Sequence, residues 1–139
     1  MYEKILIAND GSDGAAKALA TALKLAHRLK AKLAMISVEE MSRAPATIDE
    51  VIEDKREENH RYEQVIAQAQ FRAKTAHVKL ETHVVAGHAV RCIVEFIERG
   101  GFELLVIGYM GHSALYNRVI GSTTDRLVEL APCHVLVVK

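Results

Sequence analysis

Residues 103–139, ELLVIGYMGHSALYNRVIGSTTDRLVELAPCHVLVVK, predict a strand, a loop, a short helix and a second strand in succession. The apolar runs at 103–108 and 134–139 have the length of buried strands, and the first is apolar enough to be covered on both faces. The segment STTDRLVELA, residues 122–131, predicts the helix between them. Two strands joined through a helix run parallel in one sheet.

The same alternation extends back to the start of the chain. Strands are expected at 4–10, 32–38 and 78–87, and the last of them alternates with Lys79, Glu81 and His83 outward. Helices are expected at 15–30, 47–76 and 89–100, the last of which stops at Gly100 and Gly101. Strands that alternate with helices predict an α/β fold, in which an open parallel sheet carries helices on both faces. No linker, repeat or low-complexity tract interrupts the pattern, so we expect residues 1–139 to form a single domain.

Composition narrows the possible partners. The chain has 139 residues, half of them hydrophobic and only two of them proline, which argues against intrinsic disorder. Eighteen basic residues balance eighteen acidic ones, so no general attraction to nucleic acid or to an anionic membrane is expected. A local basic patch remains compatible with this balance.

The cysteines and the apolar runs indicate the cellular compartment in which the protein works. Cys92 and Cys133 lie far apart without a CxxC spacing, which favours free thiols in a reducing cytosol over a single disulfide. The apolar run near the start is too short for a signal peptide, and no stretch approaches the roughly 20 residues that span a bilayer. We therefore expect a soluble, cytoplasmic protein.

Three segments fall at the carboxyl ends of the predicted strands, where open α/β sheets bind ligands. These are NDGS at 9–12, VEE at 38–40 and the glycine-containing loop from 108 to 121. Helices begin at the same edge, and their free N–H groups and dipoles favour an anion. The sheet edge is therefore the expected ligand site.

The loop from 108 to 121 contains three glycines, Gly108, Gly111 and Gly121. Glycine lets a backbone turn sharply and approach a ligand closely. Ser122 stands at a predicted N-cap, and Asp125 three residues later suggests a capping box. The plain interpretation is a tight connection and an ordinary helix start. Three glycines followed by Ser122 and Thr123 instead favour a cradle for phosphate.

The spacing of these glycines resembles a known family. Gly108-x2-Gly111-x9-Gly121-Ser122 matches the G-x2-G-x9-G-[S/T] motif of the nucleotide-binding universal stress proteins. The opening KILIANDGS and the closing GSTTDRLVELAPCHVLVVK fall in the order seen in that family. The resemblance implies a five-stranded Rossmann-like sheet of the adenine nucleotide alpha hydrolase type, with strand order 3-2-1-4-5. It also implies a regulatory stress-response module that binds ATP, or ADP or AMP, with or without Mg²⁺.

The resemblance also assigns roles by position. Asp10 would hold the ribose or adenine side, and Val38 would meet adenine through its backbone. The phosphates would lie on Gly121 and the two hydroxyl residues that follow it. Asp10 alone would also serve as a helix cap, a role for which Ser12 competes, and His112 and Arg118 could reach phosphate as cations. The predicted nucleotide-binding residues are Asp10, Ser12, Val38, Gly108, Met110, Gly111, His112, Gly121, Ser122 and Thr123.

Three positions depart from the family pattern. Glu103 replaces the usual Asp, and His134 replaces the usual Pro after the late cysteine. Neither falls on the nucleotide loops. Asn9 stands where a small or apolar residue is more common, which bears on the adenine-side contacts.

Other readings of the sequence receive less support. The stretch EDKREENHRYEQ, residues 53–64, is expected to be a solvated helix face. The chain lacks HExxH, a complete GxSxG and GxxxxGK[ST], and it lacks the further acids of a phosphoacceptor domain. We therefore predict no catalytic residue and no metal ligand, and leave enzymatic activity open. After a nucleotide-binding module, the alternatives in order are a slow Mg²⁺-dependent ATPase and a ligand-free dimeric docking module with an unknown protein partner.

The last strand predicts self-association. In the order 3-2-1-4-5 it lies at the edge of the sheet, where unpaired N–H and C=O groups invite another strand. Pairing about a two-fold axis would satisfy those groups. We predict a homodimer through Val135, Leu136, Val137 and Val138.

Overall fold

The computed structural model describes residues 1–40, 48–109 and 120–139. Strands and helices alternate along these residues, as the sequence predicts, and each boundary lies within two residues of its expected place. The strands are β1 (Lys4–Ala8), β2 (Lys32–Glu39), β3 (Leu80–Ala86), β4 (Leu104–Gly108) and β5 (His134–Val138). The helices are α1 (Asp13–Leu29), α2 (Ile48–Thr75), α3 (Ala89–Gly100) and α4 (Ser122–Leu130).

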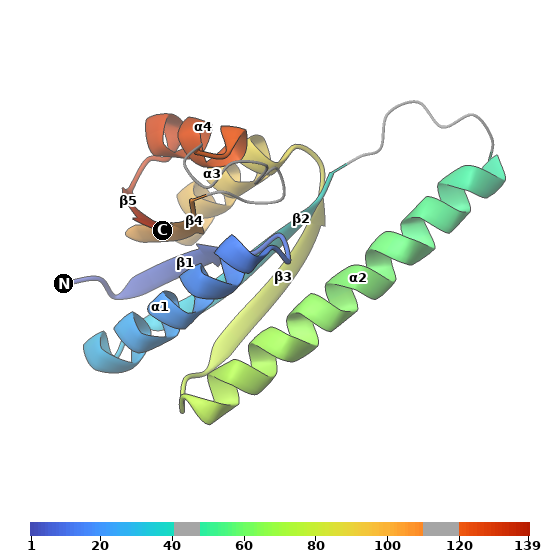
Figure 1. Ribbon diagram of the computed structural model, residues 1–139. Helices are drawn as coiled ribbons and strands as arrows, with labels where there is room; N and C mark the ends of the chain where they lie inside the picture. Colours follow the sequence, from blue (N-terminus) through green and yellow to red (C-terminus); the bar gives the residue numbers. More distant parts are fainter. Residues whose placement is uncertain (41–47, 110–119) are drawn as a thin grey trace.

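The five strands form one parallel sheet of order β3-β2-β1-β4-β5, which confirms the predicted order. Ile5 of β1 lies beside both Leu33 of β2 and Leu104 of β4. Since all strands run in the same direction, their carboxyl ends share one edge of the sheet (Figure 1). β5 occupies one side of the sheet and β3 the other.

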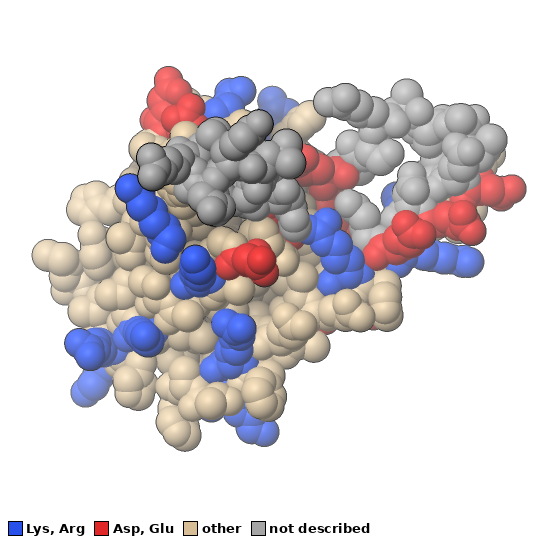
Figure 2. All heavy atoms as spheres, in the orientation of Figure 1, with Lys and Arg blue, Asp and Glu red and all other residues tan. Residues whose placement is uncertain are grey.

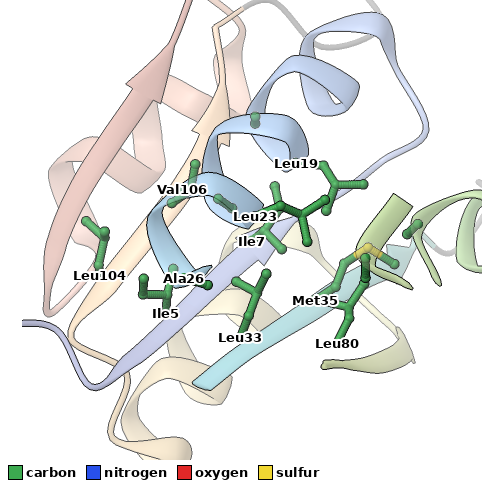
Figure 3. Close-up of a cluster of buried hydrophobic side chains, with 14 residues drawn as sticks. Ile5, Ile7, Leu19, Leu23, Ala26, Leu33, Met35, Leu80, Leu104 and Val106 are labelled. Carbon is green, nitrogen blue, oxygen red and sulfur yellow. The ribbon is translucent and has the colours of Figure 1, made fainter. Parts of the chain in front are cut away.

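Helices cover both faces of the sheet (Figure 1). Alternate strand residues face opposite ways, so Ile5 and Ile7 pack against α1 while Leu6 packs on the side of α3 and α4. Figure 3 shows Leu19, Leu23 and Ala26 of α1 seated over the central strands. The side chains of Ile5, Leu6 and Ile7 are fully buried, which is why β1 is apolar after its first residue, Lys4.

The second half of α2 packs on the sheet, and its first half extends past it (Figure 1). Tyr62, Ala69 and Ala73 are buried, whereas Ile48 and Ile52 near the start of the helix are exposed. Among the described helices, α2 included, none is both long enough and apolar enough to cross a membrane.

β3 is covered more than its sequence predicts. Lys79 and Glu81 are exposed as expected. His83, also expected outward, lies against the ring of Phe96 of α3, with 4.8 Å between ring centroids. His83 thus points to the same side as the exposed Glu81, as predicted, but α3 covers part of it.

Candidate functional site

A cavity of about 370 Å³ opens at the carboxyl edge of the sheet. Its walls come from segments that are far apart in the sequence: the ends of β1, β2 and β4, the middle of α2, and the starts of α1, α3 and α4. Every predicted site residue that the structure describes lines it: Asp10, Ser12, Val38, Gly108, Gly121, Ser122 and Thr123. The predicted Met110, Gly111 and His112, and also Arg118, lie outside the described residues.

The β1–α1 loop is held by its own side chains. The amide of Gly11 donates to Asn9 Oδ1 at 2.9 Å, and the amide of Ser12 donates to Asp10 Oδ1 at 3.0 Å. Asn9 is buried, and its side-chain amide donates to Met35 Sδ at 3.4 Å. Gly11 has a φ of 82°, a conformation that favours glycine. The unusual Asn9 thus belongs to the scaffold beneath Asp10, which stands at the cavity wall.

The competition for the α1 cap is resolved in favour of Ser12. Its Oγ accepts a hydrogen bond from the amide of Ala15 at 3.1 Å, the ordinary N-cap contact. Asp10 therefore does not serve as the helix cap. Ser12 is buried beneath the loop, so its contribution to the cavity is mainly to fix the course of the chain.

Val38, near the end of β2, lines the cavity. Its carbonyl accepts a hydrogen bond from the Tyr62 hydroxyl at 2.9 Å. The neighbouring Ser37 hydroxyl donates to the carbonyl of Asn9 at 2.7 Å and so ties β2 to the β1–α1 loop. A carbonyl oxygen has two lone pairs, so the bond from Tyr62 leaves room for a second donor.

Arg61 and Tyr62 of α2 are site residues that the sequence analysis did not select. The Arg61 guanidinium donates to the carbonyl of Asp10 and lies 5.3 Å from the Tyr62 ring centroid. The predicted solvated face at 53–64 is therefore wrong for Arg61, because α2 borders the cavity at this point, whereas the burial of Tyr62 agrees with its expected place on the apolar side of the helix. The available signal was an aromatic residue at the end of a charged run, directly before the apolar pair Val65 and Ile66.

Close packing explains why residue 108 is a glycine. A Cβ at this position would lie 2.6 Å from the carbonyl carbon of Gly14 and 2.8 Å from its oxygen. The start of α1 therefore lies directly against the end of β4. Gly108 is not among the residues with positive φ, so the expected sharp turn is not its reason. The close approach that the structure shows is to the backbone of Gly14, and the predicted approach to a ligand stays a prediction.

α4 begins one residue earlier than expected. Gly121 is its N-cap, with extended backbone angles, and Ser122 is its first helical residue, so the predicted capping box from Ser122 to Asp125 is wrong. Instead, the amide of Asp125 donates to the carbonyl of Gly121 at 2.9 Å. Among the described residues no side chain caps this helix end. Within the part of the chain that the structure describes, its first amides therefore lie at the cavity wall without a side-chain acceptor.

Thr124 connects α4 to β4 and was also missed. Its hydroxyl donates to the carbonyl of Gly108 at 2.7 Å, and its side chain is buried. Ser122 and Thr123, in contrast, are exposed on the cavity side. Thr124 lies three residues before the buried Leu127, so both are on the same face of α4. This spacing was the sequence signal that separates Thr124 from the exposed Ser122 and Thr123.

The other two departures from the family pattern lie at the opposite end of the sheet. Glu103 Oε1 accepts hydrogen bonds from the amides of Glu3 and Lys4, at 2.7 and 3.2 Å. The ring of His134 contacts Tyr2, whose hydroxyl lies 2.7 Å from His134 Nδ1. Both residues secure the start of the chain, away from the cavity.

The cavity offers several kinds of polar contact. Charged groups on its wall come from Asp10, Glu40 and Arg61, and the uncapped amides come from the start of α4. Apolar side chains such as Ile36, Ile93 and Leu127 form its floor. Within the described parts of the chain, no three His, Cys, Asp or Glu side chains gather closely enough to hold a metal ion.

Known proteins share both the sequence pattern and this fold. Residues 1–139 match the universal stress protein family over the whole chain. The universal stress protein MJ0531 of Methanocaldococcus jannaschii is 31% identical over 144 residues, covering 100% of this chain and 83% of the relative. The structure of UspA from Lactobacillus plantarum superposes with a TM-score of 0.86 at 28% identity, covering 99% of this chain and 98% of the other.

A further solved structure, a universal stress protein in complex with cAMP, has a TM-score of 0.75 at 25% identity and covers 99% of this chain and 97% of the other. The family match extends over every strand and helix described above. This chain belongs to the universal stress protein family.

Proposed function

We propose that this chain binds an adenine nucleotide in the cavity at the carboxyl edge of the sheet and acts as a regulatory module in a stress response. One observation carries the proposal: seven residues selected from the sequence, on four separate segments, line a single cavity of about 370 Å³. That volume falls within the usual range of ligand pockets, about 300–1,000 Å³. The family membership supports the regulatory role.

The phosphates would lie at the start of α4. This helix end has no side-chain cap among the described residues, and the hydroxyls of Ser122 and Thr123 are exposed beside it. The partial positive charge of a helix N-terminus, about half a unit, favours an anion there. The bond from Thr124 to Gly108 holds this helix end against the sheet.

The nucleoside would lie across β1 and β2. Asp10 offers a carboxylate to ribose hydroxyls, and the Val38 carbonyl can accept a second hydrogen bond, from the amino group of adenine. Arg61 and Tyr62 border the same region from α2. The relative solved with cAMP supports an adenine nucleotide as the ligand class.

The helix end can be tested with a pair of variants that differ by one charge. Gly121 has extended angles that any residue adopts, so Gly121→Asp and Gly121→Asn both supply a preferred N-cap. Both variants should melt at or above the wild-type temperature. Gly121→Asp should weaken binding of ATP at least tenfold more than Gly121→Asn, because its carboxylate repels the phosphates. Isothermal titration calorimetry with ATP, ADP, AMP and GTP, with and without Mg²⁺, measures both.

Equal affinities in the two variants would contradict a phosphate at this helix end. Failure of every adenine nucleotide to bind a well-folded wild type would favour the ligand-free docking module. Release of phosphate from ATP above the buffer rate, lost in Asp10→Ala, would favour the slow ATPase.

A further inference from the structure

A second hollow, of about 650 Å³, lies at the amino edge of the sheet, opposite the first cavity. It is bordered by the end of α1, the start of β2 and the turn between α2 and β3. Five basic or imidazole side chains line it, against a single acidic one. The basic and imidazole residues are His27, Lys30, Lys32, His77 and Lys79, and the acidic residue is Glu81.

The charges around this hollow are not neutralised by the protein. Within the described parts of the chain, none of the five side chains makes a hydrogen bond or an ion pair. Glu81 is engaged elsewhere, since its Oε1 lies 3.0 Å from His83 Nε2. In Figure 2, the lower end of the molecule shows Lys and Arg side chains but no acidic ones on the face in view.

Two of the lysines lie where neighbouring strands begin. Leu33 of β2 and Leu80 of β3 form the first pair of this ladder, and Lys32 and Lys79 directly precede them in the sequence. Both ammonium groups line the same hollow, and like charges that lie near one another repel. A bound anion would relieve this repulsion.

The negative ends of two helices offset only part of the positive charge at this hollow. α1 and α2 both end at this edge, and each carboxyl terminus carries roughly half a negative unit charge. Three ammonium groups outnumber one carboxylate by two, so a net positive charge remains even after both helix ends are counted.

We propose that this hollow binds an inorganic oligophosphate. Ammonium groups from three segments, the end of α1, β2 and the turn before β3, suit an anion with several charged groups better than a single one. The uncharged lining residues Ala26, Ala31, Leu33 and Val78 are aliphatic, so the only rings that line the hollow are the imidazoles of His27 and His77. The site is separate from the nucleotide cavity and does not depend on its occupant.

The test is a titration of the whole chain with tripolyphosphate. Lys32→Gln/Lys79→Gln removes two charges from the hollow, whereas Lys17→Gln/Lys24→Gln removes two charges from the exposed face of α1 and serves as the matched control. The affinity should fall at least tenfold in the first double variant and less than threefold in the second. Lys30→Gly, placed at a left-handed residue with a φ of 54°, should weaken binding without lowering the melting temperature.

The location is read from amide chemical shifts in the same titration. Tripolyphosphate should shift the amides of residues 30–33 and 77–81, and these shifts should persist in Gly121→Asp. Equal weakening in both double variants would overturn the proposal, because it would show attraction to net charge alone. Shifts confined to residues 121–125, and lost in Gly121→Asp, would also overturn it. So would displacement of tripolyphosphate from residues 30–33 and 77–81 by AMP, which would assign the hollow to nucleotides.

Discussion

At the scale of single residues, the site depends on contacts between segments that are distant in the sequence. Asp10 and Val38 were predictable because parallel strands bring their carboxyl ends together. Arg61 was not, because its place at the cavity depends on where α2 crosses the sheet. The close approach of Gly108 to Gly14 likewise follows from packing and not from any local pattern.

Thr124 provides a residue-scale prediction. Thr124→Val keeps the side-chain shape but removes the hydrogen bond to the Gly108 carbonyl. The free energy of unfolding should fall by about 1 kcal/mol, since the carbonyl loses its buried partner. Nucleotide affinity should fall as well, because α4 is less firmly placed. Thr123→Val, at an exposed position, should change stability little. Equal losses of stability in the two variants, measured by urea unfolding, would contradict this role.

Cys133 provides a second prediction at the scale of single residues. Burial raises the pKa of the Cys133 thiol, against a smaller opposing effect of a backbone hydrogen bond at Leu105. A raised pKa keeps the thiol protonated, and only the thiolate is a strong nucleophile. Alkylation of Cys133 by iodoacetamide at pH 8 should therefore be slower in the folded protein than in urea, and should rise with pH. Mass spectrometry of the modified peptide measures the rates, and an equal rate in both states would refute the prediction.

At the scale of elements, most strands and helices were predictable because their apolar spacing is regular and their ends carry ordinary signals. Gly101, in the left-handed conformation at φ 65°, ends α3 where the sequence places the stop. The start of α4 was misassigned by one residue, since serine is the commoner cap and glycine leaves no side-chain signal.

The cap of α1 provides an element-scale prediction. Ser12→Ala removes the bond from the Ala15 amide to Ser12 Oγ. The free energy of unfolding should fall by about 1 kcal/mol, the usual effect of losing such a cap. Ser12→Asp, which preserves an acceptor, should retain most of the stability. A wild-type melting temperature in Ser12→Ala would show that the contact contributes nothing.

At the scale of the whole molecule, the alternation of strands and helices predicts a parallel sheet, but it leaves the strand order open. The order 3-2-1-4-5 came from the family resemblance, and the structure confirms it. That order leaves β5 at the edge of the sheet, where Val135, Leu136, Val137 and Val138 are the proposed contacts with a second copy.

Proline can test this homodimer at a defined position. The His134 amide donates to the Glu103 carbonyl and the Val138 carbonyl accepts from the Tyr109 amide, both on the segment that contains β4, so the alternating backbone groups of Val137 point to the open edge. Val137→Pro removes an outward N–H and should convert the dimer to the 15.4 kDa monomer in sedimentation velocity at micromolar concentration. Val137→Thr keeps the N–H and should remain dimeric. A wild type that sediments only as a monomer would refute the interface.

The most direct test of the central claim is an amide NMR titration of the wild-type chain with ATP. We predict saturable shifts at Asp10, Val38 and residues 121–124, the described walls of the cavity that come from separate segments. Residues 30–33 at the amino edge, which border the second hollow, should shift only at a higher ATP concentration. If the spectrum shows a folded protein but millimolar ATP shifts no amide at the carboxyl edge, the proposed nucleotide site is contradicted.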